Sequence, residues 1–463
     1  MEHGSANFCV MPRQPRRQFI RTLAAGVGAA AAMPGRAENS GPAEPTVELR
    51  PPERPAGIPT LWVGAVTHES ATVKTKLPPG LKARLLVLKF GGTPIFFDPV
   101  TPKEPRSTVA AFHLTGLEPD TRYTCTLEVG GKPSTYPPAM VRTFPAAGQA
   151  ASFQFAFSSC ARTGSQHQVF STIAAKDPSV FLHLGDLHYT NFSRSDPRLY
   201  RAAWDTILSS TTQGALYRSV PWAYIYDDHD FGPNDADDRN PGRPASRRVY
   251  REYAPHYPLP ADVMAPHMEG DAPIFQAFTL ARARFIFTDL RSERVPAKLP
   301  DDAGKSMMGP VQKDWFFREL LAASKTHGII FWASSVPWIG KPGGDSWQAY
   351  TTERREICNF LARHSIHNLC ILCGDAHMLA ADDGRNSDYS DTQRLRIPVL
   401  HGSALDQGGS VKGGPYSHGT HPSEAKEGCF GWVEVKDDGK RIQVAFSGRN
   451  QDDKALIQLA FEV

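Results

Sequence analysis

From about residue 150 to the end of the chain, short apolar runs rich in aromatic and β-branched residues alternate with segments of helical periodicity. Strands are expected at 153–158, 180–184, 222–226, 285–288, 329–333 and 369–373, and helices at 166–176, 198–208, 312–323 and 353–363. Residues 432–435 and 442–446 alternate as further strands. Because each sheet must bury its apolar face, this order favours two β-layers with helices outside. We therefore expect an α/β fold with a four-layer αββα sandwich over residues 150–463.

Residues 58–147 follow a different pattern. Short alternating segments at 61–66, 71–75, 83–88 and 121–129 are separated by Pro and Gly, and none has a helical period. Strands at this spacing are typical of a small β-sandwich. The run from Leu117 to Tyr123 resembles the tyrosine-corner segment of fibronectin type III domains, in which a Tyr hydroxyl bonds back to the chain. We expect a fibronectin type III-like domain here that is structural or helps to shape a cleft.

The N-terminus has the three regions of a secretory signal. Arg16 and Arg17 precede an Ala/Gly-rich apolar stretch, and small residues around Ala37 offer a cleavage site. The paired arginines match the twin-arginine type. The stretch is too short and too alanine-rich to span a bilayer, so a basic tail or a stable membrane anchor is the weaker interpretation. We expect a twin-arginine signal peptide at 1–37, a linker at 38–57, and a periplasmic or secreted protein exported by the twin-arginine machinery; translation could start at Met1 or Met11.

The charge and cysteine content give no support to a nucleic-acid partner, an anionic membrane partner or a zinc knuckle. Residues 1–37 hold five of the 51 basic and one of the 48 acidic residues, so the remainder has 46 basic and 47 acidic residues. This balance favours neither nucleic acid nor an anionic membrane as a partner. Cys370 and Cys373 lie three residues apart in an apolar run, where a strand points them to opposite faces. We interpret them as core residues and not as half of a zinc knuckle.

Four of the predicted strands end in polar turns that carry possible metal ligands. The first turn holds Cys160 and Arg162, and the second holds Asp186, His188 and Tyr189. The third holds Asp228 and His229 with Asn234 and Asp235 close behind, and the last holds Asp375 and His377. Taken alone, a Gly-Asp after a strand is usually a simple turn, a Cys after a strand is usually buried, and Asp-Asp-His-Asp is compatible with a solvated loop. Loops beyond the carboxyl ends of strands meet in one crevice of an open α/β sheet, so together they indicate a metal site.

These motifs resemble the PhoD-type alkaline phosphatase and phosphodiesterase branch of the calcineurin-like metallophosphoesterases. The likeness rests on Ser-Cys after the first strand, Gly-Asp-x-x-Tyr after the second, Asp-Asp-His-Asp-Phe-Gly-Pro-Asn-Asp after the third and Gly-Asp-x-His near the end. The common metallophosphoesterase pattern begins with Asp-x-His, where this chain has Cys160, and later has a His where this chain has 333–337 without one. Both departures are those of the PhoD-like branch. The resemblance implies a metallophosphoesterase-like sandwich.

By this resemblance, Cys160 and Tyr189 would be ligands of a ferric ion, and Asp186 would bridge it to a calcium site. Thiolate and phenolate are strong anionic donors, whereas calcium prefers carboxylate and amide oxygens. Oxygens of Asp228, Asn234 and Asp235 are of that kind. Asp375 and His377, two residues apart, could complete the metal shell. Which of these residues binds which ion stays open, and other divalent metals are compatible with the same donors.

The resemblance also implies hydrolysis of phosphate mono- or diesters, with a metal-activated water or a bridging oxide as nucleophile. His229 would protonate the leaving alkoxide or hold the phosphate, although it could instead be a structural histidine. Arg162 and Arg291 are candidate phosphate clamps, because a guanidinium grips two oxygens at once. For Arg291, an internal ion pair with Asp289 is equally compatible with the sequence. His188 lies between two expected ligands and could face the substrate.

Two other interpretations are compatible with the sequence. The first is a phospholipase D-like diesterase, which would need a more open cleft. The second is a secreted adhesion module in which the metals are structural, although such a site would not require a thiolate, a phenolate and a histidine at strand ends. The expected partner is a small phosphate ester, without a nucleic-acid motif. The sequence leaves the oligomeric state open.

Overall fold

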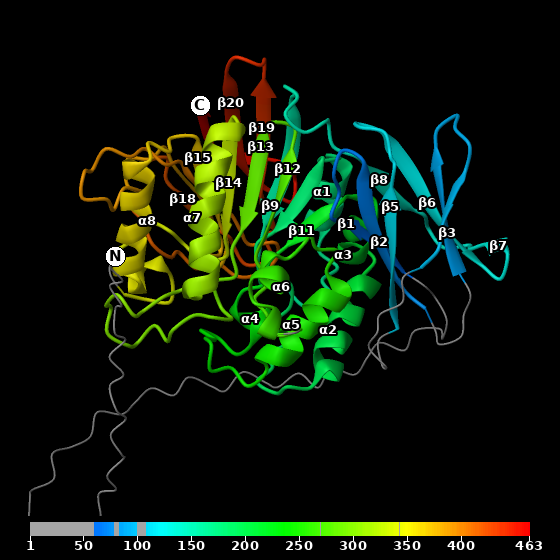
Figure 1. The fold of residues 1–463 in the computed structure, drawn as a ribbon, viewed down its shortest axis with the longest axis horizontal. Coiled ribbons are helices and arrows are strands. Elements are labelled where there is room, and N and C mark those ends of the chain that lie inside the picture. The colour runs from blue at the N-terminus through cyan, green and yellow to red at the C-terminus, as the bar shows by residue number, and fades with distance from the viewer. Residues whose placement is uncertain (1–59, 78–82, 100–107, 269, 342) are drawn as a thin grey trace, which may run out of the picture. The chain divides into compact units, whose positions relative to one another are not determined.

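The computed structural model describes residues 60–77, 83–99, 108–268, 270–341 and 343–463 (Figure 1). The expected signal peptide at 1–37 and the linker at 38–57 lie outside the described residues. Within the described part of the chain, no helix combines the length and apolarity needed to cross a membrane.

The first sheet joins segments from both ends of the chain. Its strands are, in spatial order, β21 (Ala455–Glu462), β20 (Ile442–Asn450), β19 (Cys429–Asp437), β9 (Phe153–Ser158), β10 (Val180–His183), β11 (Trp222–Tyr224), β1 (Leu61–Gly64), β2 (Ser70–Lys76) and β5 (Val109–Thr115). The strands from β9 to β1 run parallel, and the flanking strands are antiparallel. Because these central strands are parallel, the carboxyl ends of β9, β10 and β11 lie at the same edge of the sheet.

The second sheet has a parallel centre as well. Its order is β12 (Gln276–Leu280), β13 (Ala283–Phe287), β14 (Ile329–Ser334), β15 (Leu369–Cys373), β17 (Val399–Gly402), β16 (Met378–Asp382) and β18 (Thr420–Pro422). Along β14, Phe331 belongs to one apolar cluster and Trp332 to another, because successive side chains point to opposite faces. Strand β14 is thus buried on both faces, which explains its continuous apolar sequence.

The two sheets pack face to face through aromatic side chains. The ring of Phe155 on β9 lies 5.3 Å from that of Phe285 and 5.0 Å from that of Phe331, both on the second sheet. On the other face of the second sheet, Phe316 of α7 (Gly309–Thr326) packs on Trp332 with ring centres 4.7 Å apart. Helix α8 (Thr351–Arg363) lies beside α7, as Figure 1 shows.

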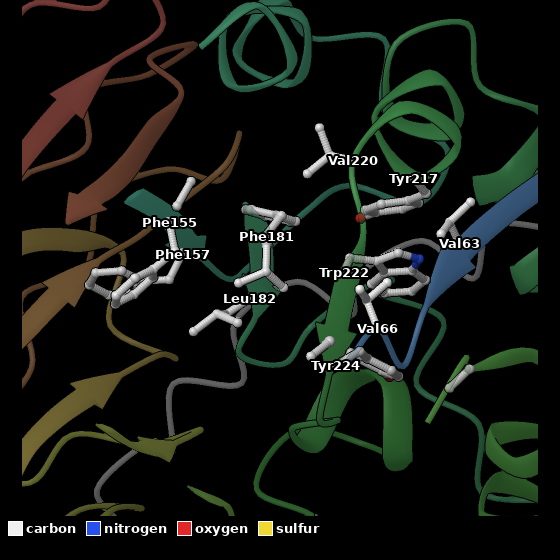
Figure 2. Packing of buried hydrophobic residues seen from close by; sticks show 14 of the residues in the cluster. Val63, Val66, Phe155, Phe157, Phe181, Leu182, Tyr217, Val220, Trp222 and Tyr224 are labelled. Atoms are coloured by element: carbon white, nitrogen blue, oxygen red, sulfur yellow. The ribbon is translucent and has the colours of Figure 1, made fainter. Parts of the chain in front are cut away.

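Most of the remaining helices lie between consecutive strands of the first sheet or between β11 and β12. They are α1 (Gln168–Ala175), α2 (Pro197–Ser209), α3 (Gln213–Ser219), α4 (Asp228–Phe231), α5 (Arg243–Tyr253) and α6 (Pro260–Met264), with single turns at η1 (Pro266–Met268) and η2 (Trp347–Ala349). Tyr217 of α3 stacks on Trp222 of β11 with ring centres 4.2 Å apart (Figure 2). This contact attaches α3 to the first sheet.

The N-terminal strands are divided between a third sheet and the first sheet. Strands β4 (Ile95–Phe97), β3 (Ala83–Lys89), β6 (Arg122–Val129) and β7 (Lys132–Pro133) form a third sheet, with β8 (Ala139–Arg142) beside β6. The hydroxyl oxygen of Tyr123 accepts a hydrogen bond from the backbone N–H of Glu118 at 2.8 Å, which is the contact that the tyrosine-corner pattern predicts. Strands β1, β2 and β5, in contrast, extend the first sheet beyond β11.

The N-terminal strands also complete helix α5. The ammonium of Lys74 on β2 donates to the carbonyls of Arg251, Glu252 and Ala254 at 2.8–3.1 Å. The indole N–H of Trp62 on β1 donates to the carbonyl of Tyr253 at 2.7 Å. The last carbonyls of a helix have no partner within the helix, so these side chains satisfy acceptors that would otherwise be buried unpaired. Residues on both sides of position 147 therefore share a sheet and a helix terminus.

The cysteines of the described chain are free and buried. Cys370 packs in the cluster between the sheets, and Cys373 packs in the cluster under α7 and α8. The interpretation of this pair as core residues on opposite faces is confirmed.

Candidate metal centre

The four polar turns meet where the carboxyl ends of the two sheets come together. Three turns follow β9, β10 and β11 of the first sheet, and the fourth follows β15 of the second. Backbone bonds join the first two turns, from the N–H of Cys160 to the carbonyl of Gly185 at 3.1 Å and from Ala161 to Asp186 at 2.8 Å. The four turns thus meet between two packed sheets. The sequence had predicted that they meet at the edge of one open sheet.

The backbone is strained at the expected ligands. Cys160, Asp186 and Asp375 have φ values of 62°, 54° and 61°, in the left-handed region that non-glycine residues rarely adopt. Such residues are held by their surroundings and cluster at functional sites. Gly185 has a φ of 105°, and a Cβ there would lie 2.5 Å from the Cβ of Asp227. The close approach of these two turns therefore requires glycine.

The first group of donors gathers around Asp186. Sulfur and oxygen or nitrogen atoms of Cys160, Asp186 and His377 lie within 4.8 Å of one another. The Oδ2 of Asp186 accepts from Cys160 Sγ at 3.5 Å and from the Tyr189 hydroxyl at 2.9 Å. The Tyr189 hydroxyl is 3.2 Å from Nε2 of His377. A thiol, a phenol, a carboxylate and an imidazole therefore point at one position.

The tautomer of His377 suits a metal ligand. Its Nδ1 faces the carbonyl of Gly408, which can only accept, so this nitrogen carries the proton. Nε2 is then the nitrogen with a free lone pair, and it points toward Tyr189 and Asp186. A backbone acceptor behind a ligating histidine is the usual way in which proteins orient such a ring.

Two further groups of donors extend the site. Asp186, Asp228 and His229 form one, and Asp228, Asp235 and Asp345 form the other. The Oδ2 of Asp228 accepts from the backbone N–H of Asp235 at 2.7 Å. Asp235 is exposed, and it lines a groove of about 750 Å³ together with Asn234 and Asp345. Oxygen donors of this kind suit calcium.

Asp375 provides the most direct test of whether these residues fit a cation. Its Oδ1 accepts from Nζ of Lys412 at 2.5 Å. Its Oδ2 is buried and has no hydrogen-bond partner among the described residues. A buried carboxylate oxygen without a partner is costly, since desolvation is not offset. A metal ion bound between the turns would supply the missing partner, so the donor set fits the metal that the resemblance implies.

Burial sets the protonation of the donors. It raises the pKa of the Cys160 thiol well above its usual range, and the charges of Asp186 and Asp375 raise it further. The pKa of the Tyr189 phenol is raised by burial and then by Asp186 and Cys160. Burial, followed by the charge of Asp228, raises the pKa of Asp186. The Cys160 thiol and the Tyr189 phenol therefore keep their protons until a cation displaces them, as is general for thiolate and phenolate ligands.

Arg291 does not have the role expected of it as a phosphate clamp. The side chain is fully buried, and its Nε and Nη2 donate to both carboxylate oxygens of Asp227 at 2.5 and 3.0 Å. Its Nη1 donates to Asp345 at 2.6 Å. The guanidinium is not available to a substrate, because the side chain is fully buried and its donors are taken by Asp227 and Asp345. The alternative partner, Asp289, contacts only the backbone N–H of Arg291 among these atoms, at 3.2 Å.

Of the two other candidate substrate contacts, Arg162 is exposed and His188 is buried. The Arg162 side chain is exposed beside the first turn, and its backbone N–H is held by Asp406 at 2.7 Å. It remains a candidate phosphate ligand. His188 is only 1% exposed and its Nδ1 lies 2.9 Å from the Thr190 hydroxyl, so it does not face a substrate. Burial lowers the pKa of His188 to about 3, which keeps the ring neutral.

His229 is half-buried and is oriented by two neighbours. Its ring stacks on Tyr189 with centres 4.2 Å apart, and its Nδ1 lies 2.6 Å from Oδ1 of Asn191. If the amide oxygen accepts, Nδ1 carries the proton and Nε2 is left for a substrate. Burial lowers the pKa of His229, and Asp228 partly offsets that effect.

For the phosphoesterase activity that the sequence resemblance implies, we predict that Asn191→Ala lowers kcat by roughly 10–100-fold, the range typical of lost outer-sphere partners. The reason is that the ring of His229 loses the group that sets its tautomer. Steady-state kinetics on p-nitrophenyl phosphate measures the effect, and bound metal should stay unchanged. A variant with wild-type kcat would show that Asn191 does not orient His229.

Three residues of the site escaped the sequence reasoning. Asp345 lies in a loop before η2, Lys412 lies between β17 and β18, and Asn191 follows the second turn. None of them directly follows a predicted strand, which is the pattern that points to the other donors. Asn191 lies two residues after Tyr189 with a φ of 55°, so extending the second turn would have included it.

The fold and the donor set define an α/β protein with a candidate metal site at the carboxyl ends of two packed sheets. A family model described as PhoD-like phosphatase matches residues 155–441, and the chain belongs to this family. Alkaline phosphatase D of Bacillus subtilis (strain 168) is 24% identical over 345 residues, which cover 64% of this chain and 58% of that protein. The solved structure of PhoD matches with a TM-score of 0.70 and 18% identity, over 88% of this chain and 91% of that one. This likeness establishes the fold.

Proposed function

We propose that this protein is an exported, metal-dependent phosphoesterase that hydrolyses phosphate mono- or diesters. The observation that carries the proposal is the convergence of Cys160, Asp186, Tyr189 and His377 on one position, with Asp228 and Asp375 beside it. Membership of the PhoD-like phosphatase family supports the same activity. A structural metal site would not require a histidine, His229, placed next to the donors with one free nitrogen.

The proposed metals are Fe³⁺ and Ca²⁺. Cys160, Tyr189 and Asp186 would hold the ferric ion, because thiolate and phenolate stabilise a trivalent cation. Asp228, Asn234 and Asp235 offer oxygens to calcium, and Asp375 and His377 complete the shell. Bound cations supply Lewis acidity, which neutralises charge on the phosphoryl oxygens and generates a nucleophile from water.

Side chains of the protein would bind the substrate and transfer the proton. Arg162 would contact the phosphate, since it is exposed at the rim of the site. Once protonated at Nε2 as well as at Nδ1, His229 would give the Nε2 proton to the leaving alkoxide or hold the phosphoryl group. The groove lined by Asn234, Asp235 and Asp345 would receive the alcohol portion of the substrate.

Three further features belong to the proposal. The residues before 38 would be a twin-arginine signal, which places the mature protein in the periplasm or outside the cell. Residues 58–147 would be a fibronectin type III-like domain, supported by the tyrosine-corner contact of Tyr123. The two packed sheets with helices on their outer faces would correspond to a four-layer αββα sandwich.

Hydrolysis of p-nitrophenyl phosphate and bis-p-nitrophenyl phosphate, before and after chelation, tests the function. We expect activity on at least one substrate, at least a 100-fold loss after prolonged chelation, and recovery on readdition of Fe³⁺ and Ca²⁺. Activity restricted to the diester would favour the phospholipase D-like alternative. A metal-loaded protein inactive on both substrates would favour the adhesion module.

A further inference from the structure

Lys412 is a cation that lies inside the site and that no sequence motif indicated. It belongs to the segment between β17 and β18, and its Nζ contacts Oδ1 of Asp375 at 2.5 Å. We propose that Lys412 binds a non-bridging phosphoryl oxygen and makes the site selective for dianionic phosphate monoesters over monoanionic diesters. The proposal rests on the phosphoesterase function proposed above, and it names the class of substrate.

The main chain around Lys412 is held in place from several sides. The carbonyl of Lys412 accepts from the Tyr416 hydroxyl at 3.1 Å, and the same hydroxyl lies 3.1 Å from Nε2 of the fully buried His401. Backbone bonds from Ser410 to His377 at 3.2 Å and from Gly414 to Ile339 at 3.2 Å fix the segment on either side. The ammonium is thus positioned by the fold, as a binding residue must be.

Among the cations of the site, Lys412 has the geometry that a phosphate ligand requires. Arg291 is fully buried and occupied by Asp227 and Asp345. The Lys412 side chain is 41% exposed, and contacts with the described residues use one of its three N–H donors. The ammonium can therefore hold Asp375 and still offer donors to a second anion on its open side.

The position beside Asp375 relates Lys412 to the metal site. The Oδ1 of Asp375 accepts from Lys412, and its Oδ2 is buried without a hydrogen-bond partner among the described residues. The backbone carbonyl of Asp375 lies 3.7 Å from Cys160 Sγ, which belongs to the first group of donors. A phosphoryl group held by the metal position would consequently lie within reach of the ammonium. A lysine acts as a compact point charge, so its attraction grows with the charge on the phosphoryl oxygens. A monoester dianion carries one more negative charge there than a diester and gains more from the contact.

The test compares Lys412→Met and Lys412→Arg with Lys440→Met, an exposed lysine of the β19–β20 turn, as the control. For Lys412→Met we expect kcat/KM on p-nitrophenyl phosphate to fall roughly 100-fold and on bis-p-nitrophenyl phosphate less than about tenfold, as for loss of one charged hydrogen bond. The inhibition constant of inorganic phosphate should rise with the monoester loss. Lys412→Arg should recover most of the monoester activity, and bound metal should be unchanged in both variants.

Equal losses on the two substrates, an unchanged inhibition constant for phosphate, or loss of metal from Lys412→Met would overturn the proposal. In the last case Lys412 would only support Asp375. If the metal-loaded wild type hydrolyses neither substrate, the phosphoesterase function fails instead. Calorimetric binding of inorganic phosphate then decides the role of Lys412: weaker binding by Lys412→Met supports it, and equal binding contradicts it.

Discussion

Replacing Asp186 should abolish phosphoester hydrolysis and release the bound metal together. Asp186 is the carboxylate shared by two groups of donors, since its Oδ2 accepts from Cys160 and Tyr189 and its Oδ1 faces the backbone N–H of His229 at 3.3 Å. Without this carboxylate, Cys160 and Tyr189 lose the oxygen that both of them contact. We expect kcat/KM to fall by at least about 10⁴-fold, which corresponds to roughly 5 kcal/mol of transition-state stabilisation.

The choice of substitution matters because Asp186 has a φ of 54°. Asn tolerates the left-handed region better than Ala, so Asp186→Asn keeps the backbone while it removes the charge. Activity and metal content should be measured on both variants, with the exposed Asp314→Ala of α7 as the control. If Asp186→Asn is folded and still holds its metal and its activity, Asp186 is not the bridging ligand.

Removing residues 1–147 should prevent the remainder of the chain from folding. The truncation takes away β1, which pairs with β11, and leaves unpaired the carbonyls at the end of α5 that Lys74 and Trp62 satisfy. Each of these four hydrogen bonds, three of them from a charged donor, contributes about 1–3 kcal/mol, so the loss of all four approaches the whole stability of a typical domain. The exposed edge of β11 and the uncovered Trp222 add to the loss.

The truncated chain 148–463 should therefore be insoluble or lack a cooperative thermal transition and a near-ultraviolet circular dichroism signal. The single substitution Lys74→Met in the full chain is the milder companion, and it should lower the free energy of unfolding by roughly 2–4 kcal/mol through the carbonyls left unpaired. Lys76→Met, which removes a partly exposed ion pair with Asp205, should cost less than about 1 kcal/mol. A soluble truncated protein with a sharp melting transition would show that the two regions fold separately.

Local periodicity predicted the strands and helices whose own sequences are apolar or amphipathic. The strands at 153–158 and 369–373 have the predicted bounds, and the helix expected at 312–323 lies within α7. Helix α5 was missed, since its sequence is rich in arginine and its stability comes from contacts with β1 and β2. The pairing of Gly64 with Trp222 joins residues far apart in the sequence, and no local pattern carries that information.

The candidate site was predictable to the extent that its residues end strands. Cys160, Asp186 and His377 follow buried strands, and the ends of parallel strands must meet at a sheet edge. The direction of a long side chain was not predictable. Arg291 was expected to face a substrate, but its side chain points inward to Asp227. Lys412 enters the site from a glycine-rich connection, whose path depends on tertiary contacts such as that of Tyr416.

The most direct test of the metal centre is anomalous X-ray diffraction from crystals of the active protein, recorded on both sides of the iron edge. An iron peak within bonding distance of Cys160 Sγ, the Tyr189 hydroxyl and an Asp186 oxygen is the expected result, with calcium density on the Asp228 side. A fully active crystal that shows no metal peak between these four turns would contradict the account.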